Sequence, residues 1–247
     1  MIIPVSAHNH RGGARARPRG ASDDTTSPLP VPWNPSMSGR ADLWPLIHQE
    51  REALADDLSG MTEEQWATPS LCEGLTVREV LAHLTSAATL NGLRWMAGVI
   101  RCRFDFDAQV AMRLAEQMGD SGAETLARFR GVTRSTTSPP LPKPAILGEA
   151  VVHGEDIRRP LGIAGARPVA VLTRVADYYQ GSDQVVVAKS RVQGLRLQAT
   201  DGPFASGAGP LVSGSTLALI MAMTGRSAHL DDLTGDGVEI LRERVDG

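Results

Sequence analysis

Aromatic residues, basic charge and long apolar segments are all scarce in this sequence of 247 residues. Aromatic residues make up only 4%, which argues against a surface that stacks nucleic-acid bases. The net charge is -3, and the body of the chain carries no basic patch for phosphate groups. No apolar run reaches the roughly 18 residues that a membrane-spanning helix requires. We therefore expect a globular protein that binds neither nucleic acid nor membrane.

Cysteine is scarce as well. The 2 cysteines, Cys72 and Cys102, are too few for a disulfide framework. Either one could still be a reactive thiol, but neither has a CxxC partner or a neighbouring histidine in the sequence. We expect buried or unreactive side chains, in keeping with a protein of the reducing cytoplasm.

The composition divides the chain into three parts. Residues 1–40 are rich in proline, glycine, serine and arginine, which predicts a disordered N-terminal extension, or a start codon set too early with Met37 as the true start. Apolar residues at helical spacing predict a helical bundle over residues 41–182. Strand-like alternation and apolar helical segments predict a small α+β module over residues 190–247. The fold class is mainly α.

Two capping boxes predict where helices begin. In Thr62–Gln65 and Thr76–Glu79, a threonine hydroxyl and a side chain three residues later can satisfy free backbone N–H groups. We expect the second helix to run to about residue 98. Further helices are predicted over 42–58, 107–118, 121–134, 145–159, 168–180 and 215–223 with a closing helix to about 245, and strands over 195–199 and within 202–214.

Glu149 and His153 form a candidate ligand pair. They stand four residues apart in an apolar segment, so on a helix they lie one above the other on the same face. Such a pair can bind a cation, but it is also typical of a salt bridge or of a hydrogen-bonded core histidine. His83 lies beside the apolar stripe of another predicted helix and is a candidate third ligand.

Two histidines and one carboxylate leave a coordination position open, which is the pattern of catalytic zinc, although the same set suits non-haem iron. Asp156 lies two turns after Glu149 on the same predicted face. We weigh two roles for it: it accepts a hydrogen bond that orients His153, or it neutralises Arg158 or Arg159.

Several segments carry a resemblance to a known family. Residues 72–84 and 149–162 resemble two signatures of the mycothiol-dependent maleylpyruvate isomerase family, within the DinB-like superfamily. Residues 194–201, 217–226 and 233–237 are similar to its C-terminal module. The resemblance covers roughly residues 41–245. Leu75 departs from it, since the family usually has tryptophan there, and the N-terminal extension has no counterpart.

This resemblance implies a DinB-like four-helix bundle in which His83, Glu149 and His153 hold zinc or another divalent metal. It implies mycothiol, a small thiol, as co-substrate and a small electrophile as partner, in a monomer or homodimer. A metal-activated thiolate would add to a cis double bond and leave after rotation, or would stay attached in an S-transfer.

We name Arg113 as the candidate catalytic residue that would hold a substrate carboxylate, with Arg94 as the rival. The alternatives to a thiol enzyme are a non-catalytic metal-binding module and a metal-dependent hydrolase that uses water instead of a thiol.

Overall fold

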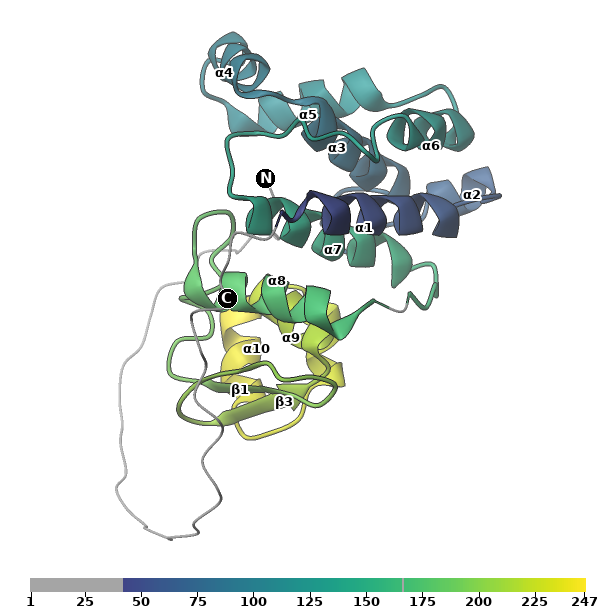
Figure 1. The fold of residues 1–247 in the computed structure, drawn as a ribbon. Coiled ribbons are helices and arrows are strands. Elements are labelled where there is room, and N and C mark those ends of the chain that lie inside the picture. Colours follow the sequence, from purple (N-terminus) through teal and green to yellow (C-terminus); the bar gives the residue numbers. More distant parts are fainter. Residues whose placement is uncertain (1–41, 166) are drawn as a thin grey trace, which may run out of the picture.

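The computed structural model describes residues 42–165 and 167–247 (Figure 1). The extension expected over residues 1–40 lies outside the described residues. In chain order, the elements are α1 (Trp44–Asp57), α2 (Glu63–Trp66), α3 (Val77–Thr89), α4 (Gly92–Arg101), α5 (Phe106–Gln117), α6 (Gly122–Arg130), α7 (Lys143–Arg158), α8 (Val169–Gly181), β1 (Arg196–Ala199), β2 (Ala205–Gly207), β3 (Leu211–Gly214), α9 (Thr216–Met223), the 3₁₀ helix η2 (Ser227–Asp232) and α10 (Val238–Asp246). This order confirms the predicted fold class, a helical bundle followed by a small α+β module.

Helices α3 and α7 occupy the centre of the bundle. Helix α3 packs against α5, α6 and α7, and α1 packs against α7. Figure 1 shows α3–α6 at one end of the molecule, α1 and α7 in the middle, and α8–α10 with the sheet at the other end. The candidate ligands therefore lie on the two helices that pack most centrally.

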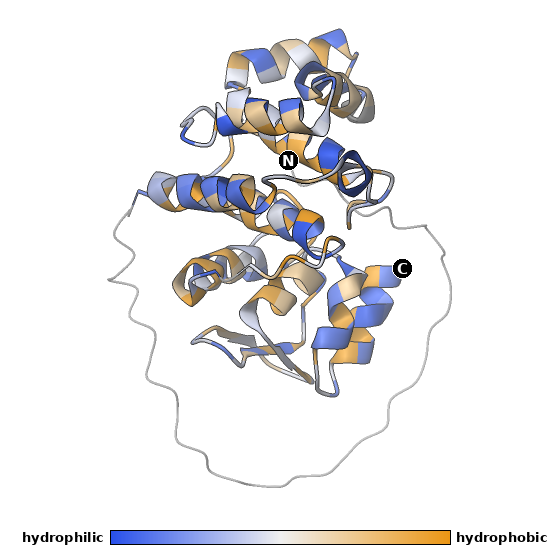
Figure 2. Cartoon of the chain, turned by 90° about the vertical axis from the view of Figure 1, so that its right-hand side faces the viewer, coloured by the Kyte–Doolittle hydropathy of each residue, from blue (hydrophilic) through white to orange (hydrophobic). Residues whose placement is uncertain are grey.

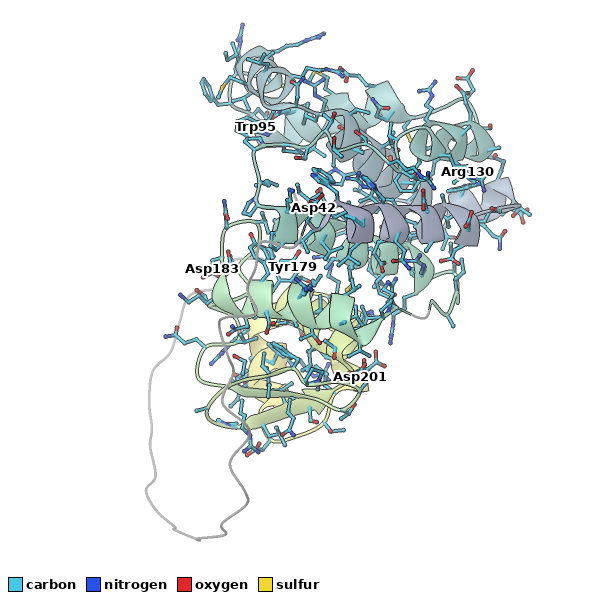
Figure 3. All side chains as sticks on the ribbon, in the orientation of Figure 1. Asp42, Trp95, Arg130, Tyr179, Asp183 and Asp201 are labelled. Carbon is cyan, nitrogen blue, oxygen red and sulfur yellow. The ribbon has the colours of Figure 1, made fainter. Side chains whose placement is uncertain are left out.

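The predicted boundary between the bundle and the C-terminal module stays a prediction. Helix α8 contacts both α7 and α9, and one cluster of buried apolar side chains runs from Ile47 and Leu147 through Leu172 to Leu219. Tyr179 of α8 lies at this junction (Figure 3), where Gly148 lets its ring approach the α7 backbone closely. A Cβ atom at residue 148 would collide with the end of that ring, so the glycine leaves room for Tyr179 against α7.

The capping box at the start of α3 forms as predicted. The Thr76 hydroxyl accepts a hydrogen bond from the Glu79 backbone N–H, and the Glu79 carboxylate accepts one from the Thr76 N–H at 2.8 Å. Both free donors are satisfied by residues within the first turn. The local sequence thus determines where the helix that carries His83 begins.

Replacing Thr76 by alanine tests the importance of this cap. We expect T76A to lower the free energy of unfolding by about 1 kcal/mol, because a backbone N–H at the helix start loses its acceptor. The measurement is urea denaturation followed by circular dichroism. T76S keeps the hydroxyl and serves as the control; equal stability of T76A and T76S would contradict a capping role.

The prediction of one helix from residue 76 to about 98 is wrong. The chain leaves helical geometry at Leu90, whose φ and ψ are -92° and 103°, and α4 begins two residues later. Asn91 accounts for the break, because its side chain accepts a hydrogen bond from the Arg94 N–H and so caps a new helix. Helix α4 then packs against α5, and its Trp95 borders a pocket described below.

The C-terminal module has a three-stranded sheet in the order β2-β1-β3. Strand β1 pairs antiparallel with β2 and parallel with β3, so that Leu197 lies opposite both Ser206 and Val212. We predicted one weak strand within residues 202–214, and the structure has two. Leu197 and Ala199 point into the core, where α9 covers β1 and β3.

Hydropathy is distributed as the helical periodicity predicts. Figure 2 shows hydrophobic and hydrophilic residues alternating along most helices in both halves of the molecule. None of the helices in the described ranges combines the length and the apolar character that a membrane crossing needs.

Candidate metal centre

The structure brings the three predicted ligands together. Glu149 and His153 lie one turn apart on α7, which is almost wholly buried, and His83 reaches them from α3. One ligand atom from each residue lies within 4.8 Å of the others, and all three side chains are buried. His83 Nε2 is 3.2 Å from Glu149 Oε1. The imidazole rings of His83 and His153 lie edge to face, with their centroids 5.0 Å apart.

His153 provides an observation that favours a metal site over an ordinary hydrogen-bonded pair. Its Nδ1 lies 2.9 Å from Asp156 Oδ2, whereas its Nε2 is buried and has no hydrogen-bond partner among the described residues. Because the Asp156 carboxylate accepts, Nδ1 carries the proton and Nε2 keeps its lone pair. A buried acceptor without a donor is costly, so the arrangement fits a cation. Two imidazoles and a carboxylate are a donor set that suits zinc.

Burial keeps His153 in the form that a metal requires. Removal from solvent lowers the pKa of His153 to about 4, although its hydrogen bond to Asp156 acts in the opposite direction. The imidazole is therefore neutral at pH 7, and the neutral ring is the form that ligates metals. The hydrogen bond to Asp156 fixes both its tautomer and its orientation.

The structure decides between the two roles considered for Asp156. Its carboxylate accepts from His153 and takes two hydrogen bonds from Arg226, with Nε at 3.0 Å from Oδ1 and Nη2 at 2.8 Å from Oδ2. Burial would raise the pKa of Asp156, but the charge of Arg226 and the His153 hydrogen bond hold it well below its usual range. Arg158 and Arg159 pair elsewhere, with Asp57 and Asp232. Asp156 therefore orients His153.

Sequence reasoning missed two residues of this network, Arg226 and Cys72. The Cys72 thiol donates to Asp156 Oδ2 at 3.0 Å and lies 3.5 Å from His153 Nδ1. Its burial agrees with prediction, but contact with a histidine was not expected. The two cysteine contacts span 84 and 81 residues, and Arg226 lies 70 residues after Asp156, so no local spacing could reveal them.

Cys72, His153 and Asp156 also lie within metal-binding distance of one another, but their chemistry favours a hydrogen-bonded network. Burial and the nearby Asp156 carboxylate raise the pKa of the Cys72 thiol, which donates its hydrogen to that carboxylate. Arg226 already neutralises Asp156. Among the described clusters, the set of His83, Glu149 and His153 is the better candidate.

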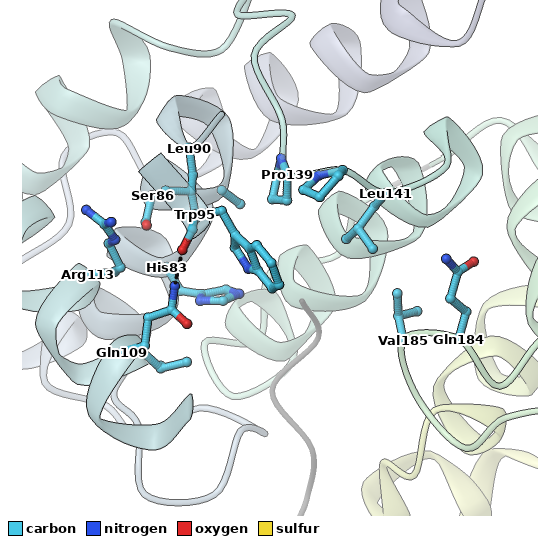
Figure 4. A pocket seen from close by; sticks show the side chains of 13 residues that line it. His83, Ser86, Leu90, Trp95, Gln109, Arg113, Pro139, Leu141, Gln184 and Val185 are labelled. Carbon is cyan, nitrogen blue, oxygen red and sulfur yellow. Dashed lines mark hydrogen bonds between the residues drawn. The ribbon is translucent and has the colours of Figure 1, made fainter. Parts of the chain in front are cut away.

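A pocket of about 280 Å³ begins beside His83. Figure 4 shows Gln109 and Arg113 on one side and Leu141, with neighbouring side chains, on the other. Arg113 lines this pocket, and Arg94 is not among its lining residues. Arg113 donates to Glu116 Oε2 and to the Arg94 carbonyl, each at 2.8 Å.

The fold and the site first define a class: helical bundles whose facing helices carry a candidate metal-ligand set in the core. Residues 47–158 match the model of the mycothiol maleylpyruvate isomerase N-terminal domain. This range contains α3, α7 and all three candidate ligands. Over residues 47–158 the chain is therefore similar to the mycothiol maleylpyruvate isomerase N-terminal domain.

Solved structures add two similar proteins. The chain is similar to a mycothiol-dependent maleylpyruvate isomerase at 15% identity, with a TM-score of 0.46 over 78% of this chain and 91% of that chain. It is similar to a histidine-to-alanine mutant of a mycothiol-dependent maleylpyruvate isomerase at 13% identity, with a TM-score of 0.45 and the same coverage. No curated protein sequence matches the chain.

Proposed function

We propose that this protein is a metal-dependent enzyme of the maleylpyruvate isomerase type, which uses mycothiol for cis–trans isomerisation or for S-transfer. The family match of residues 47–158 supports the thiol, and the site supports the metal. The observation that carries the proposal is the buried Nε2 of His153, which lacks a hydrogen-bond donor among the described residues. We further propose a cytoplasmic location, where small thiols stay reduced.

His83, Glu149 and His153 would hold zinc or another divalent ion. Such an ion would lower the pKa of a thiol that binds to it, so that the thiol is an anion at neutral pH. The chain supplies the geometry. Asp156 holds His153 in one tautomer, Arg226 keeps Asp156 ionised, and the surrounding apolar core limits access of water to the three ligands.

Arg113 would hold a carboxylate of the substrate in the pocket beside His83. In an isomerisation, the thiolate sulfur forms a bond to one alkene carbon, and the alkene electron pair moves to the conjugated carbonyl. The remaining single bond rotates, and the returning pair expels the thiolate to give the trans alkene. No oxidant or reductant is needed, and the thiol is regenerated. In an S-transfer, the carbon–sulfur bond is kept.

Elemental analysis combined with thiol-dependent turnover tests the proposal. We expect about one zinc or other divalent ion per chain, calorimetric binding of mycothiol, and conversion of maleylpyruvate or another small electrophile only when mycothiol is added. Fully folded, metal-free protein from a chelator-free purification would contradict the metal site. Turnover without thiol would indicate a hydrolase, and bound metal without any turnover would indicate a binding module.

A further inference from the structure

The pocket beside His83 has mainly apolar walls. Its volume of about 280 Å³ is near the lower end for small-molecule sites. Leu90 lies directly after α3, α5 contributes Val110, and the segment before α7 contributes Pro139 and Leu141. Val185 closes the far side, where Figure 4 shows it near Leu141. A ligand in this space would bury most of its surface against carbon atoms.

The pocket offers little charge. Among the described residues that line it, Arg113 is the one with a permanent charge. Both terminal nitrogens of Arg113 already donate, and Glu116 partly neutralises its charge. Gln109 donates its amide N–H to the Trp95 carbonyl at 3.1 Å. One carboxylate can share Arg113, and a second would find no further cationic side chain among the described residues of these walls.

We infer that the pocket selects a small electrophile with one carboxylate and an apolar remainder, in preference to a dicarboxylate. The inference rests on the proposed function, because thiol chemistry defines the ligand as an electrophile. Moving a carboxylate from water into an apolar site is unfavourable unless a partner compensates it. An apolar group in the same place gains free energy by leaving water.

A pair of cis alkenes tests the selection. Maleylpyruvate carries two carboxylates, and cis-benzoylacrylate has the same ketone-activated cis double bond with a phenyl ring in place of the second carboxylate arm. With mycothiol present, we expect kcat/KM for cis-benzoylacrylate to exceed that for maleylpyruvate by at least about tenfold. Equal values, or a preference for maleylpyruvate, would overturn the inference and leave the proposed function intact.

Leu141→Arg provides a variant with the opposite expectation. Leu141 is half-buried in the pocket wall, so a longer side chain can reach the cavity without entering the main core. The added cation should shift the ratio of the two kcat/KM values by about tenfold toward maleylpyruvate, the effect of one hydrogen bond to a charged group. Leu141→Gln, which is polar but uncharged, is the matched control. The same shift in both variants would argue against charge as the cause.

Binding separates this inference from the proposed function. The saturated analogues of the two compounds cannot react with thiols, and calorimetry measures their affinity without turnover. If no electrophile is turned over but the monocarboxylate analogue still binds more tightly, the proposed function fails and the pocket's selectivity stands. If neither analogue is preferred in a catalytically inactive protein, both fail.

Discussion

Replacing His153 by alanine is expected to weaken metal binding by at least about 100-fold. Loss of a residue that only hydrogen-bonds a metal ligand weakens metal binding by up to about 100-fold, and loss of a ligand itself should cost at least as much. The substitution removes the buried Nε2 that lacks a hydrogen-bond partner among the described residues. Arg226 and Cys72 still contact Asp156, so that carboxylate stays paired without the imidazole. Metal content after dialysis, measured by elemental analysis, and thiol-dependent turnover should fall together.

His48→Ala is the matched control for this experiment. His48 is partly buried on α1, where it stacks on Trp44, and it does not belong to the candidate ligand set. We expect H48A to keep its metal and its activity. If H153A retains as much metal as H48A, the assignment of His153 as a ligand is wrong. Circular dichroism of both metal-free proteins would show whether H153A remains folded.

Replacing Arg226 by methionine is expected to lower the free energy of unfolding by about 3–5 kcal/mol. Arg226 and Asp156 are fully buried, and methionine leaves the carboxylate without its cation. Removing one partner of such a pair costs far more than removing both, because the remaining charge is uncompensated. Urea denaturation with a chelator present measures this effect apart from any stabilisation by bound metal.

Two further variants show whether burial of the pair is the cause. Arg242→Met removes an arginine that pairs with Asp231 at the surface of the C-terminal module, and it should cost at most about 1 kcal/mol. The double variant D156N/R226M should be more stable than R226M, since the amide carries no charge that needs a partner. If R226M is no less stable than R242M, the buried pair does not stabilise the fold.

Arg226 connects the C-terminal module to the candidate site in the bundle. It follows α9 in sequence, yet its guanidinium contacts the α7 carboxylate that orients His153. Loss of this contact should therefore affect the site as well as stability. Arg226 thus links the segment after α9 directly to α7 through a buried ion pair.

Helix starts and ligand spacing on one helix could be predicted from the sequence. The capping boxes at Thr62 and Thr76 formed, because their donors and acceptors lie three residues apart. Glu149 and His153 share a face of α7 because the helical period places residues four apart on the same side. The prediction of one helix through Leu90 failed, because apolar spacing alone does not show where a helix ends. The cap at Asn91 starts a new helix although the apolar pattern continues.

The sequence alone determined what depends on neighbours within one helical turn: the main helices, their caps and the Glu149–His153 pair. Only the tertiary structure decided that His83 lies beside this pair. It also decided that Asp156 contacts His153 and Arg226 and does not pair with Arg158 or Arg159, and that the Cys72 thiol donates to Asp156. The physical reason is distance along the chain. Helical geometry fixes the relative positions of residues that are near in sequence. For residues 66 to 84 positions apart, the packing of whole helices fixes their relative positions.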